Sequence, residues 1–204
     1  MNETPPLSRI QKKNRRAILD AALDVFSQYG FRGTTLDQIA QTSGLSKPNL
    51  LYYFPTKEDI HTTLLDELMQ DWQDPMRAID PEGEPLEEIL DYVQRKLEMS
   101  RDFPRESRLF ANEILQGAPQ FLDALKGGPR HLFDEKVALF QTWMDQGKLA
   151  QVHPQHLIFS IWSLTQHYAD FEVQIRIYLG PEGKDPYPEA GKFLRTLFTR
   201  MLTP

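Results

Sequence analysis

The sequence predicts an all-α protein in which an N-terminal helix-turn-helix head of three helices precedes a larger C-terminal helical bundle. Apolar residues recur at steps of three and four along nearly the whole chain, which is the spacing of one helix face. Strand signals are absent from the sequence, which has no sustained apolar–polar alternation and no Asn-Gly hairpin turn. Residues 1–56 and 57–204 are expected to form two domains.

Glycine and hydroxyl residues mark the ends of the helices expected in the head. A Ser or Thr oxygen can accept the free amide hydrogens of a first helical turn, and glycine can adopt the left-handed backbone that ends a helix. The expected helices, each with its flanking residues, are Ile18–Phe26 before Gly30 and Gly33, Leu36–Thr42 between Thr34 or Thr35 and Gly44, and Lys47–Tyr53 after Ser46.

Longer apolar patterns predict the helices of the C-terminal part. A linker is expected where Pro75, Pro81, Gly83 and Pro85 interrupt the pattern, and the stretch Lys126–Pro129 is expected to break one helix. The expected helices are Lys57–Gln73, Leu86–Arg101, Arg105–Gln116, Pro119–Gln146, Pro154–Leu179 and Ala190–Leu202.

Charge is distributed unevenly along a chain whose formal net charge is -6. Residues 1–57 hold eight Lys/Arg against four Asp/Glu, and the remainder holds 15 against 25, so only the N-terminal end is suited to meet phosphates. The absence of cysteine excludes disulfides and thiolate catalysis. The sequence has neither an apolar stretch of membrane-spanning length nor the apolar region of a signal peptide, so we expect a cytoplasmic protein. We also expect no cofactor.

The segment Thr34–Phe54 has the pattern of a DNA-reading helix pair. Leu36, Ile39 and Ala40 are expected to face inward on its first helix, and Leu45, Leu50 and Leu51 are expected to pack back from its second. A second helix that begins with short polar and basic residues is suited to a major groove. The residues expected to face outward are Ser46, Lys47, Asn49, Tyr52 and Tyr53. An ordinary helical hairpin with half-buried tyrosines is the alternative.

A basic arm precedes the head. Its five cations could reach the DNA backbone or a minor groove, or they could belong to a solvated, disordered tail, and both interpretations stay open. The cations are Arg9, Lys12, Lys13, Arg15 and Arg16.

Polar residues lie among apolar and aromatic ones in the C-terminal part, as in a small-molecule pocket. Trp162, Gln166 and Asp170 share one face of a helix, and buried amides such as Gln166 need hydrogen-bond partners that a ligand can supply. Other candidates are Trp72, Arg108, Phe110, Glu113, Ser163 and His167. The alternative is a core network in which these polar groups hydrogen-bond to one another, together with a dimer interface.

Two other function classes compete with DNA binding. An enzyme could use Glu113 as a general base or a metal held by His153, His156, His167 and Asp170, but no recognised ligand spacing is present, so catalysis and a bound metal are not expected. A helical protein–protein adaptor, with the head as a structural corner, is the other rival.

Residues 18–64 resemble the DNA-binding domain of the TetR family of transcriptional regulators, and the matching features lie in the stretch ILDAALDVFSQYGFRGTTLDQIAQTSGLSKPNLLYYFPTKEDI. The resemblance implies a repressor that a small molecule releases, with a C-terminal bundle that binds the effector and forms a dimer. By position it implies DNA contacts from Thr35, Ser46, Lys47, Asn49, Tyr52, Tyr53 and Lys57. Many members carry tyrosine where this chain has Leu51, so that contact must be absent or moved to Tyr52.

The C-terminal part resembles the pyrimidine-utilisation repressors of the same family in stretches such as YVQRKLEMSRDFP and HPQHLIFSIWSLTQHYADF. That resemblance implies a uracil or thymine effector bound by Trp72, Lys96, Phe110, Trp162 and Gln166, with His167 and Tyr168 nearby. A flat ring can stack on tryptophan, and a carboxamide can pair with an imide edge.

The last two helices resemble the pair that joins the two subunits in this family. A two-fold dimer would also present two heads to major grooves about 34 Å apart. A monomer core is the alternative. The expected apolar faces are Leu157, Ile161, Leu164 and Tyr168 on one helix and Phe193, Leu194, Leu197, Phe198 and Met201 on the other.

Overall fold

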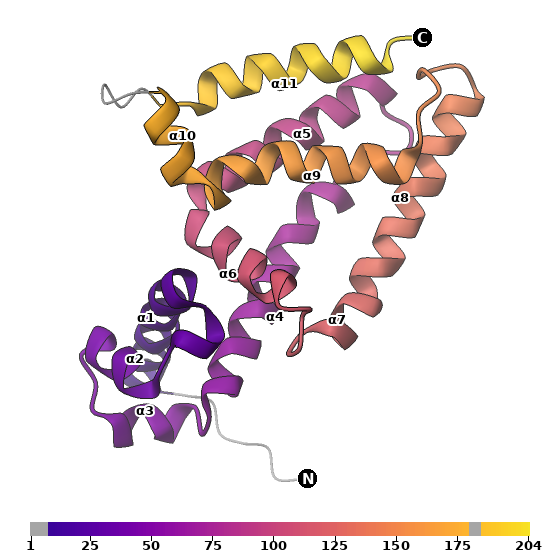
Figure 1. Ribbon diagram of the computed structural model, residues 1–204. Coiled ribbons are helices and arrows are strands. Elements are labelled where there is room, and N and C mark those ends of the chain that lie inside the picture. The colour runs from indigo at the N-terminus through magenta and orange to yellow at the C-terminus, as the bar shows by residue number, and fades with distance from the viewer. Residues whose placement is uncertain (1–7, 180–184) are drawn as a thin grey trace, which may run out of the picture. The chain divides into compact units, whose positions relative to one another are not determined.

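The computed structural model describes residues 8–179 and 185–204, and within these ranges the chain is helical without a strand (Figure 1). The all-α prediction is therefore confirmed. None of the described helices is long and apolar enough to cross a membrane. The helices are α1 (Arg9–Gly33), α2 (Leu36–Ser43), α3 (Lys47–Tyr53), α4 (Lys57–Arg77), α5 (Pro85–Asp102), α6 (Pro104–Leu115), α7 (Leu122–Lys126), α8 (Gly128–Asp145), α9 (Pro154–Asp170), α10 (Glu172–Leu179) and α11 (Tyr187–Leu202).

The chain divides into two compact units. Unit 1 comprises Met1–Leu68 and Arg108–Phe121, and unit 2 comprises Met69–Ser107 and Leu122–Pro204. Helices α4 and α6 therefore supply residues to both units. The division into functional domains after residue 56 stays a prediction, and residues 1–7, where a leader would begin, lie outside the described ranges.

The head of unit 1 has the expected order of helices, with one extension. Helix α1 begins at Arg9 and not near Ile18, because Ser8 and Gln11 form a capping box that satisfies amide hydrogens at its start. Gly30 adopts φ 65° and ψ 175° inside α1, a conformation that breaks the helix and suits glycine alone. Thr35 and Ser46 cap α2 and α3 as expected.

Three of the expected helix boundaries in the C-terminal part are wrong. Pro75 lies inside α4, in its last turn, and not in a linker; its missing amide hydrogen costs the helix one hydrogen bond, to the carbonyl oxygen four residues earlier. In the expected Pro119–Gln146 helix, the break expected at Lys126–Pro129 is confirmed at Gly127, between α7 and α8, but residues 119–121 are not helical, so the expected start is wrong. The expected Pro154–Leu179 helix is interrupted at Phe171.

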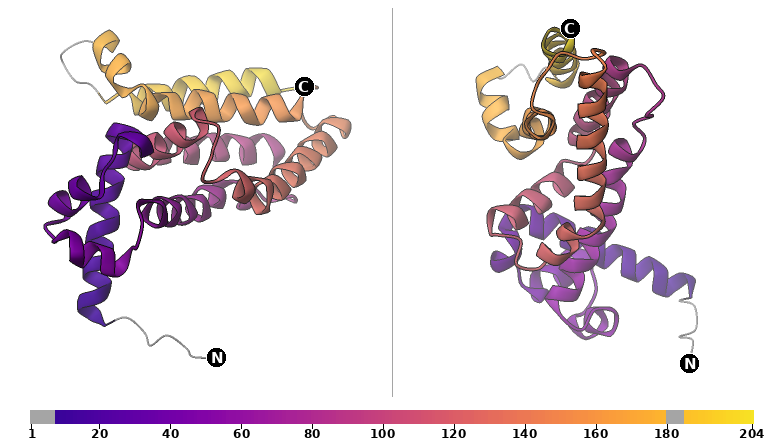
Figure 2. Two further views of the ribbon diagram at one scale, coloured as in Figure 1. Left: turned by 60° about the horizontal axis from the view of Figure 1, so that its bottom comes forward. Right: turned by 90° about the vertical axis from the view of Figure 1, so that its right-hand side faces the viewer.

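Each unit has its own apolar core. In unit 1, Ile18, Phe26, Ile39, Leu50 and Ile60 are fully buried, so α1, α2, α3 and the start of α4 share one interior. In unit 2, α5 packs against both α9 and α11, which lie alongside it (Figures 1 and 2). Four residues expected at a dimer seam are buried in this intrachain core: Leu157, Ile161, Leu194 and Phe198.

Candidate nucleic-acid interface and effector site

Helix α3 is a short helix with one buried face. Its start is fixed by the Ser46 hydroxyl, which accepts a hydrogen bond from the Asn49 amide at 3.4 Å. Leu50 is fully buried and anchors the helix to the core of unit 1. Leu51, which was expected to pack back with Leu50, is 37% exposed, so that expectation is wrong. Neighbouring positions on an α-helix lie 100° apart, and only one of the two leucines can face the core.

The outward face of α3 carries the side chains expected to meet DNA. Ser46, Lys47, Asn49 and Tyr52 are exposed, and Tyr53 is half-buried. The Lys47 ammonium lies 2.9 Å from Asp37, an exposed pair that a phosphate can replace at little cost. This face is therefore polar, basic at its start and aromatic at its end.

Thr35 and Lys57 have structural partners in unit 1. The Thr35 hydroxyl accepts from the Gln38 amide at 3.2 Å and is exposed at the start of α2. The Lys57 ammonium donates to the carbonyl oxygens of Phe31 and Thr34, both at 2.7 Å, and lies 4.3 Å from the centre of the Phe31 ring. Lys57 thus closes the end of α1, and at most one of its three N–H groups is left for a phosphate.

His61 lies one turn after Lys57 on α4, and the sequence did not single it out. Its ring packs 4.8 Å from both Phe26 and Phe31, and its Nδ1 has no hydrogen-bond partner among the described residues. Burial, assisted by the charge of Lys57, lowers the pKa of His61 to about 4. The ring is therefore neutral near pH 7 and serves as a core aromatic residue.

Lys96 and Trp72 form a buried polar site in unit 2. The Lys96 ammonium lies 5.0 Å from the centre of the Trp72 ring, and the two residues are 5% and 8% exposed. Burial lowers the pKa of Lys96 to about 7, and the negative charge of Asp170 acts in the opposite direction. A cation over an indole face in a dry environment is suited to a flat ligand that carries a hydrogen-bond acceptor.

Asp170, which the sequence placed on one helix face with Gln166, and Ser107, which the sequence did not single out, add to this site. The Ser107 hydroxyl donates to Asp170 Oδ1 at 2.6 Å, which joins the start of α6 to the end of α9. The four-residue spacing of Gln166 and Asp170 on one helix face was a usable signal for Asp170. Nothing in the local sequence marks Ser107.

Trp162 has a hydrogen-bond partner within the chain. Its indole N–H donates to the hydroxyl of buried Tyr92 at 2.7 Å. The Trp162 ring lies 5.8 Å from Phe133 and 5.7 Å from Phe159. Burial raises the pKa of Tyr92, so its hydroxyl stays protonated. Trp162 can therefore offer a ligand its ring face, while its N–H is already satisfied.

The remaining expected effector residues do not all line the same surface. Gln166 and Tyr168 are half-buried on α9, whereas His167 is exposed and stacks on Phe171 at 4.8 Å. Consecutive helical residues point in different directions, so His167 faces away from its two neighbours. Phe110 belongs to the part of α6 that is grouped with unit 1.

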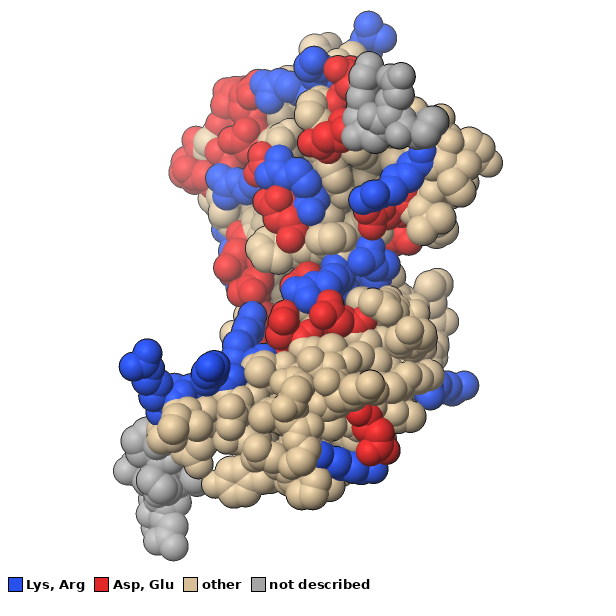
Figure 3. Space-filling model, turned by 90° about the vertical axis from the view of Figure 1, so that its left-hand side faces the viewer, with Lys and Arg blue, Asp and Glu red and all other residues tan. Residues whose placement is uncertain are grey.

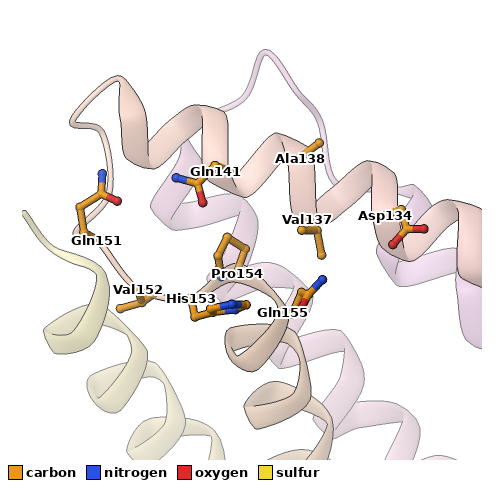
Figure 4. Close-up of a pocket in the computed structure, with 9 residues that line it drawn as sticks. All are labelled: Asp134, Val137, Ala138, Gln141, Gln151, Val152, His153, Pro154 and Gln155. Atoms are coloured by element: carbon orange, nitrogen blue, oxygen red, sulfur yellow. The ribbon is translucent and has the colours of Figure 1, made fainter.

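A separate surface groove of about 740 Å³ lies between α8 and the segment that leads into α9 (Figure 4). Its lining includes Asp134, Gln141 and His153, and none of the expected effector residues takes part. Among the described residues no group of three or more His, Cys, Asp or Glu is placed to hold a metal. Glu113, the candidate general base, accepts a hydrogen bond from the Gln120 amide at 2.8 Å.

Two family models match the chain. Residues 18–62 match the model described as "Bacterial regulatory proteins, tetR family", and residues 65–204 match "YcdC-like protein, C-terminal region". The chain is 49% identical over 178 residues to the HTH-type transcriptional regulator RutR of Escherichia coli (strain K12), which covers 87% of this chain and 84% of that protein.

Solved structures share the fold. A TetR-like transcriptional regulator from Rhodococcus sp. RHA1 superimposes with a TM-score of 0.69 at 21% identity, over 96% of this chain and 97% of that one. AibR, solved in complex with isovaleryl coenzyme A and operator DNA, gives a TM-score of 0.69 at 18% identity, over 94% and 99% of the two chains.

Proposed function

Because the chain belongs to the TetR family of transcriptional regulators, we propose that it is a repressor whose dimer leaves its operator when a pyrimidine binds. Its relatives are regulators and not enzymes, as the sequence led us to expect. The observation that carries the DNA-binding part is the outward face of α3, which exposes Ser46, Lys47 and Asn49 above a fully buried Leu50.

We assign the DNA contacts by chemistry. Short polar and basic side chains at the start of α3 are suited to base edges, so Lys47 and Asn49 read the major groove. The hydroxyls of Tyr52 and Tyr53 and the first residues of α2 and α3, Thr35 and Ser46, are suited to phosphate oxygens. Lys57 contributes through its third N–H and the amino end of α4.

We assign the effector to the buried site at Trp72 and Lys96. A uracil or thymine ring stacks on the indole, and the ammonium of Lys96 donates to a ring carbonyl oxygen. Gln166, half-buried on α9, offers both an acceptor and a donor to the imide edge. Trp162 and Tyr168 supply apolar surface, Phe110 is assigned through the family resemblance alone, and His167 is the weakest candidate because its ring is exposed.

We place the dimer contact on the outer faces of α9 and α11. Phe159 is 45% and Phe193 59% exposed, and Leu164, Leu197 and Met201 are half-buried, so apolar surface remains after the intrachain core is complete. Helix α4 carries both Lys57 and Trp72, so an effector that displaces α4 changes the separation of the two heads. Such a switch requires the effector to bind the two head spacings with different affinity.

The test compares DNA binding with and without effector. The native chain selects duplexes from a random-sequence pool, and uracil, thymine, other nucleobases and small carboxylates are then titrated against the selected complex. Release of the DNA by uracil or thymine alone supports the proposal. Release of the DNA by another compound would identify that compound as the effector and overturn the pyrimidine assignment. Lys96→Met is expected to abolish release while keeping DNA binding, whereas Asn49→Ala is expected to weaken DNA binding while keeping pyrimidine binding.

A further inference from the structure

The first two turns of α1 are an ordered part of unit 1 and not a loose tail. The Ser8 hydroxyl accepts from the Gln11 amide at 3.3 Å, and the Gln11 side chain accepts from the Ser8 amide at 2.8 Å. This reciprocal pair satisfies amide hydrogens that would otherwise fray the helix start. The alternative of a disordered tail therefore does not hold for Arg9–Arg16, which are helical.

This segment, residues 9–16, is attached by side-chain contacts to the end of α3, the recognition helix of the proposed DNA-binding head. The side-chain amide of Gln11 donates through Nε2 to the Tyr52 hydroxyl at 3.1 Å, and the side-chain amide of Asn14 donates through Nδ2 to the Tyr53 hydroxyl at 3.3 Å. The Arg15 guanidinium lies 5.2 Å from the centre of the Phe54 ring. Because three consecutive residues at the end of α3 are held in this way, residues 9–16 keep a fixed place beside the surface that meets DNA.

The opposite face of residues 9–16 is basic. Arg9, Lys12 and Lys13 follow the three- and four-residue spacing of one helix face, and all three are exposed. In the part of the chain that the structure describes, no acidic side chain pairs with them. The next cation on this face, Arg16, lies 3.5 Å from Glu67. Figure 3 shows Lys and Arg side chains gathered at the lower left of the molecule.

Helix stability does not account for these cations. Positive side chains near the amino end of a helix interact unfavourably with the helix dipole, and the first turn of α1 contains no acidic residue. The arrangement concentrates positive charge at one fixed position on a chain whose net charge is -6. A polyanion that already contacts α3 would neutralise that charge.

We propose that Arg9, Lys12 and Lys13 bind backbone phosphates of DNA beside the major groove that α3 enters. The inference rests on the proposed DNA-binding function and adds a second, sequence-independent contact to it. Phosphate contacts hold a protein in register on the duplex, while base contacts select the sequence. Residues 9–16 therefore strengthen binding to every duplex and orient α3 through Tyr52 and Tyr53.

The test removes the three charges while keeping good helix formers. The variant Arg9→Gln/Lys12→Gln/Lys13→Gln is compared with the control Lys126→Gln/Arg130→Gln/Lys148→Gln, which removes the same charge from exposed positions of unit 2. A third variant, Arg9→Lys/Lys12→Arg/Lys13→Arg, keeps the charge. Affinity for a duplex that the native chain selected from a random pool is measured over a range of salt concentrations, and circular dichroism checks the helix content.

The head variant should bind at least tenfold more weakly at low salt. Its slope of log affinity against log salt should fall by about 0.9 for each phosphate that the protein no longer neutralises, or up to about 5 for a dimer. The control and the charge-keeping variant should retain the native slope. If the head variant also keeps the native slope, the assignment of residues 9–16 is overturned and the DNA-binding proposal stands. If the native chain selects no duplex at all, the proposed function itself fails.

Discussion

Replacing Lys96 with methionine should remove a specific pH dependence from the stability of the protein. Burial lowers the pKa of this lysine from 10.5 to about 7, with the charge of Asp170 acting against the change. The unfolded chain keeps the lysine proton up to about pH 10.5, whereas the native chain releases it near pH 7. Between these values the unfolded state binds more protons, so the free energy of unfolding rises with pH.

The size of the effect follows from the width of this window. One proton of difference changes the free energy of unfolding by about 1.4 kcal/mol per pH unit. Between pH 7 and pH 9, the penalty of burying the Lys96 charge therefore falls progressively by about 2 to 3 kcal/mol. Methionine has a similar length and no charge, so Lys96→Met should lack this increment and should be the more stable protein near pH 6.

Urea denaturation at pH 6, 7, 8 and 9 measures the increment for the native chain and for each variant. Lys148→Met, the same change at an exposed lysine, should leave it intact. Asp170→Asn removes the charge that raises the pKa of Lys96, so the rise in stability should begin at a lower pH. Equal pH dependence in the native chain and in Lys96→Met would refute a buried lysine with a lowered pKa.

Three further changes test local structure in denaturation experiments. Gly30→Ala should cost about 1 to 3 kcal/mol because φ 65° with ψ 175° is open essentially to glycine alone, while Gly128→Ala, with ordinary φ and free space, should cost little; equal losses would contradict this. Ser46→Ala should cost about 1 kcal/mol by uncapping α3, and it should lower DNA affinity more than it lowers effector affinity. Tyr92→Phe should cost about 1 to 3 kcal/mol by leaving the Trp162 N–H without its acceptor, and an unchanged stability would mean that another group satisfies it.

The order and type of the helices followed from local sequence. Apolar spacing located the helical segments, although α9 and α10 were expected as one helix, and Thr35, Ser46 and Gly44 marked helix ends because capping involves groups three or four residues apart. Two helix boundaries were missed although the features that decide them are local. Pro75 was tolerated in a last turn, and the capping box at Ser8 extended α1 beyond its apolar pattern.

The recognition helix was largely determined by the sequence, because a seven-residue helix anchored by one buried leucine fixes which side chains face outward. The exception, Leu51, shows that an apolar side chain need not be an inward one. The effector site depends more on the tertiary structure. Trp72 and Lys96 lie on different helices, and only the tertiary structure brings the Lys96 ammonium to 5.0 Å from the centre of the Trp72 ring.

Sequence by itself determined the helices, their caps and the outward face of α3, since each depends on interactions within a few residues of one another. The tertiary structure alone decided the rest: that the Trp162 N–H is satisfied by Tyr92, that Lys57 closes the end of α1, and that Lys96 is buried near the charge of Asp170. These contacts join residues between about 20 and 75 positions apart, and no local pattern specifies which distant partner a polar side chain will meet.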